Sequence, residues 1–322
     1  MLLRTLTGLV SPAGSRARLT TFIFHRVLDE PDDLLTGEPD RQHFGALLDW
    51  ISEQYQVLDP VQACERLVAS SLPERAAVIT FDDGYADNYQ NALPLLSERR
   101  LKACFFVATG FTAGGAMFND RVIGAIGGTS VSSAHFPWLV GEPLSLEGPV
   151  QKRQAVGRVL GAIKARPLDE RDQCVEALVT SLGADAKQAL MMTEEQIRGL
   201  AKAGMTVGGH TRHHPILKAI SPEDSVIEIE QGRQDLTDML GDAPVLFAYP
   251  NGAPGRDFDT SHMQIVSKAG YQFAFSTHKG AATSMTDRFA IPRFTPWDRT
   301  RGAFSVRAVL NTFGGDPGHG IA

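Results

Sequence analysis

Short apolar runs recur along the chain and predict a series of buried strands. A continuous apolar run bounded by turn-forming residues is typical of a strand that is covered on both faces of a parallel sheet. Such runs occupy residues 20–27, about 57–58, 76–81, 103–110, 205–210, 243–250, 271–277 and 288–294.

Apolar residues at helical spacing fill most of the intervals between these runs. In residues 41–54, for example, Phe44, Leu47, Leu48 and Ile51 share one helical face. Similar patterns cover residues from 60 onward, 88–100, 193–204, 222–240, 263–270 and about 300–313. This alternation predicts an α/β fold, which we interpret as a deformed (β/α) barrel of seven or eight strands rather than two domains.

One segment breaks this rhythm. Residues from about 111 to 190 begin with a stretch rich in Gly, Ser and Pro, and a helical stretch over 151–182 follows. We interpret it as an insertion after the fourth strand that packs over one mouth of the barrel. The expected organisation is an N-terminal extension over residues 1–19 and a barrel over 20–322 that contains the insertion.

Charge and cysteine content narrow the function classes. The 322 residues carry a net charge of −6 and contain no long basic run, so we do not expect nucleic acid as a partner. Cys64, Cys104 and Cys174 are odd in number and widely separated, which argues against a disulfide framework and a cysteine zinc site. No apolar run approaches the ~20 residues of a transmembrane span.

The N-terminal stretch MLLRTLTGLVSPAGSRARL is too weakly apolar and too interrupted for a signal peptide. Leu2, Leu3, Leu6, Leu9 and Val10 fall on one helical face, which can dock on the barrel or rest on a membrane surface. Docking is the interpretation that we favour. We therefore expect a cytoplasmic protein, with membrane association as the alternative.

Two adjacent aspartates stand where one buried strand stops. In VITFDDGY, Asp82 and Asp83 directly follow the apolar run 76–81. Asp-Asp-Gly is a common solvated turn after a strand. The carboxyl end of a strand is also where α/β folds bind their ligands, so a functional site is the other interpretation.

Clustered histidines follow a second strand, in VGGHTRHHPIL. His210 and His214 are four residues apart, so one turn can aim both imidazoles at one point, whereas His213 points elsewhere. A solvated turn is the alternative. Two imidazoles and one carboxylate suit a catalytic metal ion with an open position, and the second carboxylate can accept a proton from water. These residues alone do not decide which of Asp82 and Asp83 takes which role.

An ordered set of motifs resembles the polysaccharide deacetylases, carbohydrate esterase family 4, which includes chitooligosaccharide deacetylases. TFDDG and HTRHHP carry the resemblance most directly. FIFHRV, ACFFVATG, MMTEEQIRGLAKAGMTVGGHTRHHPIL and FAYPNG look like the bacterial exopolysaccharide-associated branch. The similarity covers about residues 20–110 and 190–295 and leaves the insertion uncovered. It implies a deformed (β/α) barrel that hydrolyses N-acetyl groups of amino-sugar polymers.

The resemblance also implies roles for the motif residues. Carried over by motif position, Asp82 is the general base, and Asp83, His210 and His214 hold a metal ion, usually zinc. Cobalt or nickel would suit the same ligands.

The third motif of the family departs from its usual form. Where the family has Arg-x-Pro-Tyr, this chain has Ala248 and Asn251 at the Arg and Tyr positions. Arg293, in IPRF, is our candidate to replace the missing guanidinium beside the catalytic Asp. The backbone N–H of Asn251 is a candidate oxyanion donor. We group Asn251 with Tyr249, Arg293 and Trp297 as oxyanion- or substrate-binding residues.

The general acid of the family is also not matched cleanly, because its Leu-x-His motif is absent in that form. His25, in FIFHRV, is the candidate that we favour, and His278, in FSTHKG, is the alternative. Phe118, Phe136, Trp138 and Trp297 are aromatic residues in the insertion and loops that can stack on sugar rings or belong to local cores.

We thus expect a metal-dependent hydrolase that removes N-acetyl groups from an N-acetylhexosamine polymer or oligomer in exopolysaccharide or cell-surface glycan biosynthesis. One alternative is a metal-dependent amidohydrolase or esterase that acts on a small acylated substrate. The other is a non-catalytic glycan-binding homologue. The sequence leaves the oligomeric state open.

Overall fold

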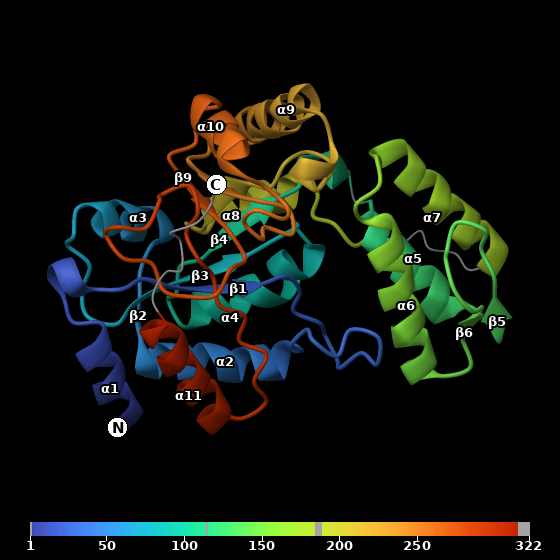
Figure 1. Ribbon diagram of the computed structural model, residues 1–322. Coiled ribbons are helices and arrows are strands. Elements are labelled where there is room, and N and C mark those ends of the chain that lie inside the picture. The colour runs from blue at the N-terminus through green and yellow to red at the C-terminus, as the bar shows by residue number, and fades with distance from the viewer. Residues whose placement is uncertain (1, 114, 184–188, 315–322) are drawn as a thin grey trace.

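A curled parallel sheet forms the centre of the computed structural model, which describes residues 2–113, 115–183 and 189–314 (Figure 1). Residues 1, 114, 184–188 and 315–322, which fall in the expected extension, insertion and barrel end, lie outside this description. Within the described part, the sheet has seven strands in the order β1-β3-β4-β7-β8-β9, and β2 also pairs with β3. The strands are β1 (Thr20–Phe24), β2 (Gln56–Val57), β3 (Ala76–Phe81), β4 (Cys104–Val107), β7 (Thr206–Gly209), β8 (Leu246–Ala248) and β9 (Phe273–Phe275).

A short segment joins the two ends of the sheet. Ile291 bridges Phe275 of β9, and Phe294 bridges Phe22 of β1, both in parallel orientation. The sheet therefore curls into the deformed (β/α) barrel that we expected. The expectation of a full strand over 288–294 is wrong, because only isolated bridges form. Pro292 lies between the two bridging residues and has no N–H to donate to a ladder.

Helices cover the outside of the barrel, close to the ranges that apolar spacing predicts. In α2 (Arg41–Gln54), Phe44, Leu47, Leu48 and Ile51 are fully buried, as expected for its inner face. A π-helical turn over Asn88–Ala92 precedes α4, so the expected helix over 88–100 forms in two parts. The other barrel helices are α3 (Pro60–Val68), α4 (Leu93–Glu98), α8 (Glu194–Lys202), α9 (Pro222–Leu240), α10 (Thr260–Lys268) and α11 (Arg301–Phe313).

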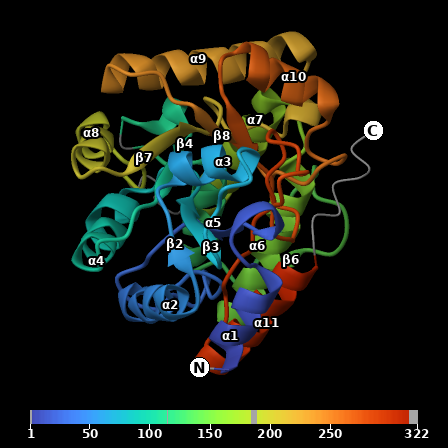
Figure 2. The ribbon, with the colours of Figure 1, turned by 90° about the vertical axis from the view of Figure 1, so that its left-hand side faces the viewer.

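The N-terminal helix α1 (Leu2–Val10) lies beside α11 (Figure 2). Thr7 is buried and accepts a hydrogen bond of 3.1 Å from Gln54 Nε2 of α2. Leu9, however, is 74% exposed, so the apolar face that we expected to dock is only partly covered. The side chains of Leu2 and Leu3 lie outside the described residues. Among the described residues, no helix combines the length and apolar character that crossing a bilayer requires.

The segment after β4 forms a separate helical layer at one side of the barrel, green in Figure 1. We call residues 115–190 the inserted unit. Its elements are α5 (Phe118–Gly128), β5 (Ser133–Ala134), β6 (Leu144–Ser145), α6 (Pro149–Ile163) and α7 (Leu168–Leu182). They share an apolar cluster of their own that includes Val122, Val159 and Leu178. The carbonyl of Gly115 accepts hydrogen bonds from both Leu190 N (3.1 Å) and Met191 N (3.2 Å), so the unit leaves and rejoins the barrel at one place.

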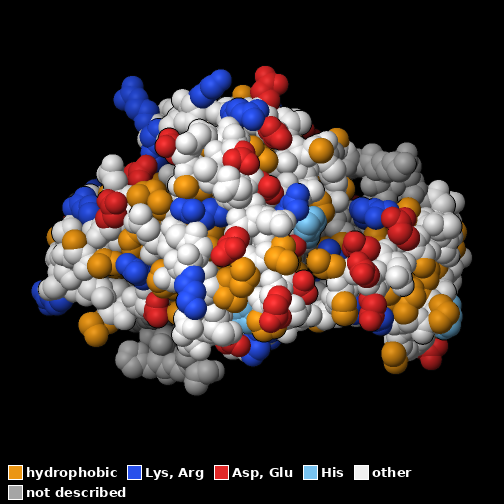
Figure 3. All heavy atoms as spheres, turned by 90° about the horizontal axis from the view of Figure 1, so that it is seen from above, with side chains coloured by type: hydrophobic (Ala, Val, Ile, Leu, Met, Phe, Trp, Pro, Cys, Tyr) orange, Lys and Arg blue, Asp and Glu red, His pale blue; other side chains and the backbone are white. Residues whose placement is uncertain are grey.

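The face seen from above the barrel carries acidic and basic side chains interspersed with one another (Figure 3). A protein that binds the phosphate backbone of nucleic acid gathers Lys and Arg on one surface. On this face the two kinds of charge are mixed, and the exclusion of nucleic acid stays a prediction from the sequence.

Candidate functional site

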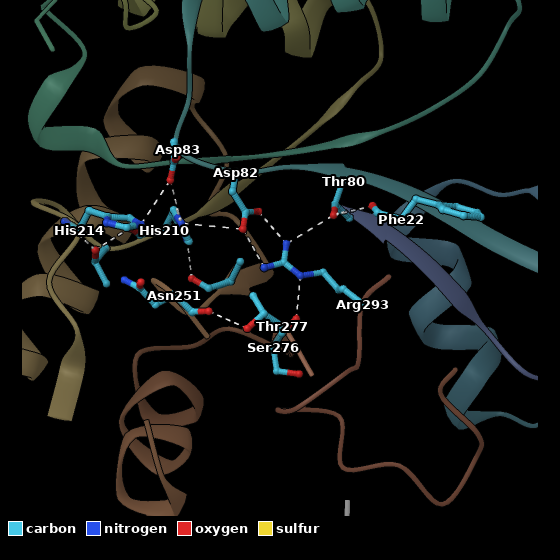
Figure 4. A network of polar contacts seen from close by, with 12 residues as sticks. Phe22, Thr80, Asp82, Asp83, His210, His214, Asn251, Ser276, Thr277 and Arg293 are labelled. Carbon is cyan, nitrogen blue, oxygen red and sulfur yellow. Dashed lines mark hydrogen bonds and ion pairs between the residues drawn. The ribbon is translucent and has the colours of Figure 1, made fainter. Parts of the chain in front are cut away.

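The carboxyl ends of neighbouring strands bring the aspartates and histidines together. Asp82 and Asp83 directly follow β3, and His210 directly follows β7. Because β4 pairs with β3 on one side and with β7 on the other, both in parallel, these strands end at the same edge of the sheet. His214 reaches the same point from the loop after His210 (Figure 4).

Asp83, His210 and His214 form a compact cluster of donor atoms. Asp83 Oδ1 lies 3.3 Å from Nε2 of each histidine, and one ligand atom from each residue lies within 4.8 Å of the others. His210 Nδ1 lies 2.7 Å from the carbonyl of Ala248. Nδ1 must donate its proton to that carbonyl, so the lone pair of Nε2 faces the cluster.

The protonation states of the cluster suit a metal ion. Burial alone would raise the pKa of Asp83, but its contact with His210 and the charges of His214 and His25 hold it well below its usual range. Burial lowers the pKa of His214 to about 4, although the charge of Asp83 opposes this. An anionic carboxylate and neutral imidazoles are the forms that bind divalent zinc, cobalt or nickel. Three protein ligands also leave a position open for water or substrate.

The backbone of the cluster is held in an unusual conformation. Asp83 (φ 75°), Thr211 (φ 61°) and His214 (φ 54°) all occupy the left-handed region. Non-glycine residues in this region cost free energy and tend to gather at functional sites. The turns after β3 and β7 are thus specialised rather than ordinary solvated turns.

Asp82 stands beside the cluster and is held by Arg293. The guanidinium donates two hydrogen bonds to the carboxylate, of 2.6 and 2.7 Å, and a third of 2.8 Å to the carbonyl of Ser276 (Figure 4). Burial alone would raise the pKa of Asp82, but the charges of Arg293 and His210 lower it, so the carboxylate is ionised. Asp82 Oδ2 lies 4.0 Å from His210 Nε2.

Arg293 therefore occupies the position that we expected for a replacement guanidinium. Its placement among substrate-binding residues needs correction, because its side chain is fully buried behind Asp82 and does not line the cavity.

A cavity of about 330 Å³ opens over these groups and has walls from both the barrel and the inserted unit. From the barrel it is lined by His25, Asp82, Asp83, His210, His214, Asn251 and Thr277. From the inserted unit it is lined by Phe118 and Asn119 of α5, Leu160 of α6, and Lys164 just after α6. The inserted unit thus packs over the mouth of the barrel that carries the site.

Asn119, Leu160, Lys164 and Thr277 are lining residues that the sequence did not reveal. Leu160 and Lys164 are four residues apart and share one face of a helix, which is a weak signal. Many polar and apolar pairs in the chain have the same spacing. Only the packing of the inserted unit against the barrel identifies the face that meets the site.

Of the two candidate acids, the structure brings only His25 to the cavity. Burial would lower the pKa of His25, but the negative charges of Asp83, Glu38 and Asp82 outweigh this and raise it above its usual value. His278 is half-buried and is not among the residues that line the cavity.

Asn251 lines the cavity and has a positive φ of 57°. Its carbonyl accepts a hydrogen bond of 2.6 Å from Thr277 Oγ1. Among the described residues, no group accepts a hydrogen bond from its N–H. That N–H is therefore available to a ligand, as the oxyanion expectation requires.

Tyr249 and Trp297 do not reach the cavity. Tyr249 is fully buried, and its ring stacks on Phe258 with centroids 3.7 Å apart, so the expectation that it contacts substrate is corrected. Trp297 is 55% exposed, with the guanidinium of Arg307 5.0 Å from its ring centroid, and does not line the cavity.

Of the other aromatic candidates, Phe118 lines the cavity. Phe136 and Trp138 stack on each other within the inserted unit, with centroids 5.2 Å apart. They belong to its local core.

Comparisons with known proteins find similarity to polysaccharide deacetylases. A family model described as polysaccharide deacetylase matches residues 69–126 and 170–274, about half of the chain. The Bacillus subtilis (strain 168) protein YxkH, which is named as a polysaccharide deacetylase, is 22% identical over 255 residues. That match covers 79% of this chain, and the chain spans 63% of the length of YxkH.

Three solved structures share the fold. The Streptococcus pyogenes deacetylase PplD, in complex with acetate, has a TM-score of 0.62 at 17% identity, over 91% of this chain and 98% of PplD. IcaB from Ammonifex degensii has a TM-score of 0.56 at 18% identity, over 94% and 98%. A de-N-acetylase from Aggregatibacter actinomycetemcomitans has a TM-score of 0.60 at 14% identity, over 91% and 100%.

Proposed function

The chain belongs to the polysaccharide deacetylase family, and we propose that it is a metal-dependent hydrolase that removes N-acetyl groups from an N-acetylhexosamine polymer or oligomer. One observation carries the proposal: Asp83, His210 and His214 converge in the same cavity as an ionised Asp82. PplD is named as a deacetylase, which supports an acetyl group as the group removed, and the name of the Aggregatibacter de-N-acetylase supports an acetamide.

Asp83, His210 and His214 would hold the metal ion, with zinc as the first choice and cobalt or nickel as alternatives. When bound, such an ion acts as a Lewis acid and lowers the pKa of a coordinated water. The carbonyl of Ala248 orients the His210 ring for this task through Nδ1.

Asp82 acts as the general base in this proposal. Its carboxylate lies at the edge of the cluster, and Arg293 holds both oxygens, which fixes their direction and keeps them ionised. An ionised, oriented carboxylate can take a proton from the water that attacks the acetamide carbon. A positioned base contributes on the order of 10²- to 10⁴-fold to the rate.

His25 and Asn251 complete the reaction. The unpaired N–H of Asn251 donates to the oxygen of the acetamide as negative charge develops on it. His25, whose pKa is raised, then gives its proton to the departing amine. Without that proton the amine is a poor leaving group.

The proposed setting is exopolysaccharide or cell-surface glycan biosynthesis, in the cytoplasm or at a membrane surface. A second candidate is hydrolysis of a small acylated amide or ester. The wall that the inserted unit places over the cavity favours it, because that wall leaves less room for a long polymer. A non-catalytic glycan-binding role is the weaker alternative, since Asp82 is present and ionised.

Acetate release tests the proposal. We expect the zinc-loaded protein to release acetate from oligomers or polymers of N-acetylglucosamine, a chelator to stop it and zinc to restore it. Faster turnover of simple acetate esters than of any acetylated amino sugar would favour the second candidate. Oligosaccharide binding without acetate release after zinc is added would favour the non-catalytic role.

A further inference from the structure

Residues of and just after α6 form a wall of the cavity that the family model does not match. Leu160 and Lys164 lie one turn apart and line the same cavity as Asp83 and His210. Both belong to residues 127–169, which the family model leaves unmatched between its two matching segments. The family motifs therefore assign no role to these two side chains, and their role has to be argued from the cavity itself.

Lys164 is free to bind a ligand. It follows α6 directly, is exposed, and forms no hydrogen bond or ion pair through its ammonium group with any residue that the structure describes. Lys152, earlier in the same helix, differs, because its Nζ donates to the carbonyls of Gly127 (2.8 Å) and Thr129 (2.9 Å). The ammonium of Lys152 thus holds the inserted unit together, whereas that of Lys164 faces the cavity unpaired.

Neither carboxylate of the cavity balances the positive charge of Lys164. The charge of Asp82 is balanced by its two hydrogen bonds from Arg293. The charge of Asp83 is directed at the cluster with His210 and His214, where a divalent cation would more than balance it. A neutral sugar would leave the ammonium of Lys164 unpaired, whereas an anionic sugar would complement it.

We propose that Lys164 binds an anionic group, a carboxylate or a phosphate, that the substrate carries close to the acetylated amino sugar. Leu160, half-buried one turn earlier, provides apolar surface beside it. This inference rests on the proposed function and narrows it from N-acetylhexosamines in general to those with an anionic substituent.

The test compares acetylated sugars that carry no anion, a carboxylate or a phosphate. Methyl N-acetylglucosaminide is neutral, N-acetylmuramic acid adds a carboxylate, and N-acetylglucosamine 1-phosphate adds a phosphate. We expect the zinc-loaded protein to prefer at least one anionic sugar, and the sugar that it prefers identifies the anion. K164M should lower kcat/KM for that sugar about 10- to 100-fold more than it lowers kcat/KM for the neutral sugar, which is the usual worth of a charge-assisted hydrogen bond.

Two further variants provide matched controls. K164R keeps a positive charge and should retain most of the preference. Lys268, the last residue of α10, is also exposed near the end of a helix but lies outside the cavity, so K268M should behave as the unaltered protein. Equal kcat/KM for neutral and anionic sugars in the unaltered protein, or a preference that survives in K164M, would overturn the proposal.

Binding separates this proposal from the proposed function. Calorimetry with glucosamine 1-phosphate and muramic acid, the deacetylated products, needs no turnover. We expect affinity for at least one of them to fall about 10- to 100-fold in K164M and to be unchanged in K268M. If this loss appears while no sugar releases acetate, the anion site stands and the hydrolase proposal fails. If the protein releases acetate but K164M changes neither binding nor turnover, the hydrolase proposal stands and the anion site fails.

Discussion

Arg293 and Asp82 form a two-pronged ion pair although 211 positions separate them in the chain. The family motif that would supply a guanidinium near this place has Ala248 instead. Arg293 comes from the segment that closes the barrel between β9 and β1, and its Nε is fixed by the carbonyl of Ser276. The same type of side chain thus reaches the aspartate from another segment of the chain.

Replacing Arg293 should damage both stability and rate. R293A leaves the buried carboxylate of Asp82 without its partner, which typically costs about 3–5 kcal/mol in the free energy of unfolding. The pKa of Asp82 should rise as well, so less of the base is ionised and acetate release falls. R288A is the matched control, since Arg288 is exposed, lies 5.0 Å from the ring centroid of Phe289 and forms no ion pair with any described residue. Urea unfolding of R293A that matches R288A would show that the ion pair contributes little.

Asp82 and Asp83 should respond differently to removal of their charge. D82N should keep the bound metal ion, because Asp82 is not part of the three-donor cluster, but should lose about 10²- to 10⁴-fold in kcat. D83N should lose the metal ion itself. Metal content by atomic emission, measured beside acetate release, separates the two effects. Loss of metal from D82N with retention in D83N would reverse the assigned roles.

Neighbouring histidines give a second contrast in metal binding. H214Q removes a ligand, so we expect its zinc content after dialysis to fall from about one per chain towards zero. H213Q is the control, because His213 Nδ1 is 2.7 Å from Glu228 Oε1 and the residue is outside the cluster. Glu228 also accepts from the backbone N–H of Arg212 and His213, which keeps the loop in place in that variant. Equal zinc loss from both variants would point to a general loop defect.

Activity should fall on the alkaline side as His25 loses its proton. The raised pKa of His25 keeps the imidazole protonated to higher pH than an ordinary histidine, so the alkaline limb should lie above pH 6.5. The lowered pKa of Asp82 keeps this base ionised at acidic pH, so the acidic limb of the profile should lie below pH 3.8. The profile of kcat against pH should thus be bell-shaped, and H25Q should lose the alkaline limb along with most of the rate. An unchanged limb in H25Q, but a lost one in H278Q, would transfer the acid role to His278.

Asp120 should make the stability of the protein depend on pH. This buried carboxylate accepts hydrogen bonds of 3.1 Å from Tyr85 Oη and from Met117 N, and burial raises its pKa to about 7. In the unfolded chain it titrates near 3.8, so between pH 4 and 7 the folded protein binds more protons. The free energy of unfolding should fall as pH rises through this window. D120N should reduce that slope, whereas D169N, at an exposed position of α7, should not. Parallel slopes for all three proteins would contradict this role.

Strand positions and the core of the site could be predicted from the sequence because each depends on local pattern. The apolar run 76–81 is β3 itself, and the spacing of His210 and His214 suits their convergence on Asp83. The family motifs supplied the roles that spacing left open. Pairing of Arg293 with Asp82 could be predicted only because the family arginine is absent at Ala248, so that another arginine had to be sought.

Other features depend on tertiary packing and could not be read from local pattern. Tyr249 adjoins the site in sequence, yet its ring is buried against Phe258, whereas Asn251, two residues later, lines the cavity. Lys164 carries no motif, and it reaches the cavity only through the way α6 packs against α5 and the barrel. Residues 288–294 have the composition of a strand, but Pro292 limits them to two bridges.

The two hydrogen bonds to the carbonyl of Gly115 hold both ends of the inserted unit together at one place on the barrel. Leu190 and Met191 both bond to the carbonyl of the residue at which the unit begins. The two ends of the unit therefore stay the same short distance apart in the barrel, whatever the length of chain between them. Helices of this unit can therefore be gained, shortened or exchanged without any change in the order or pairing of the barrel strands. A change in this unit can thus alter the groups that meet a substrate while Asp83 and His210, the proposed metal ligands that follow β3 and β7, keep their positions.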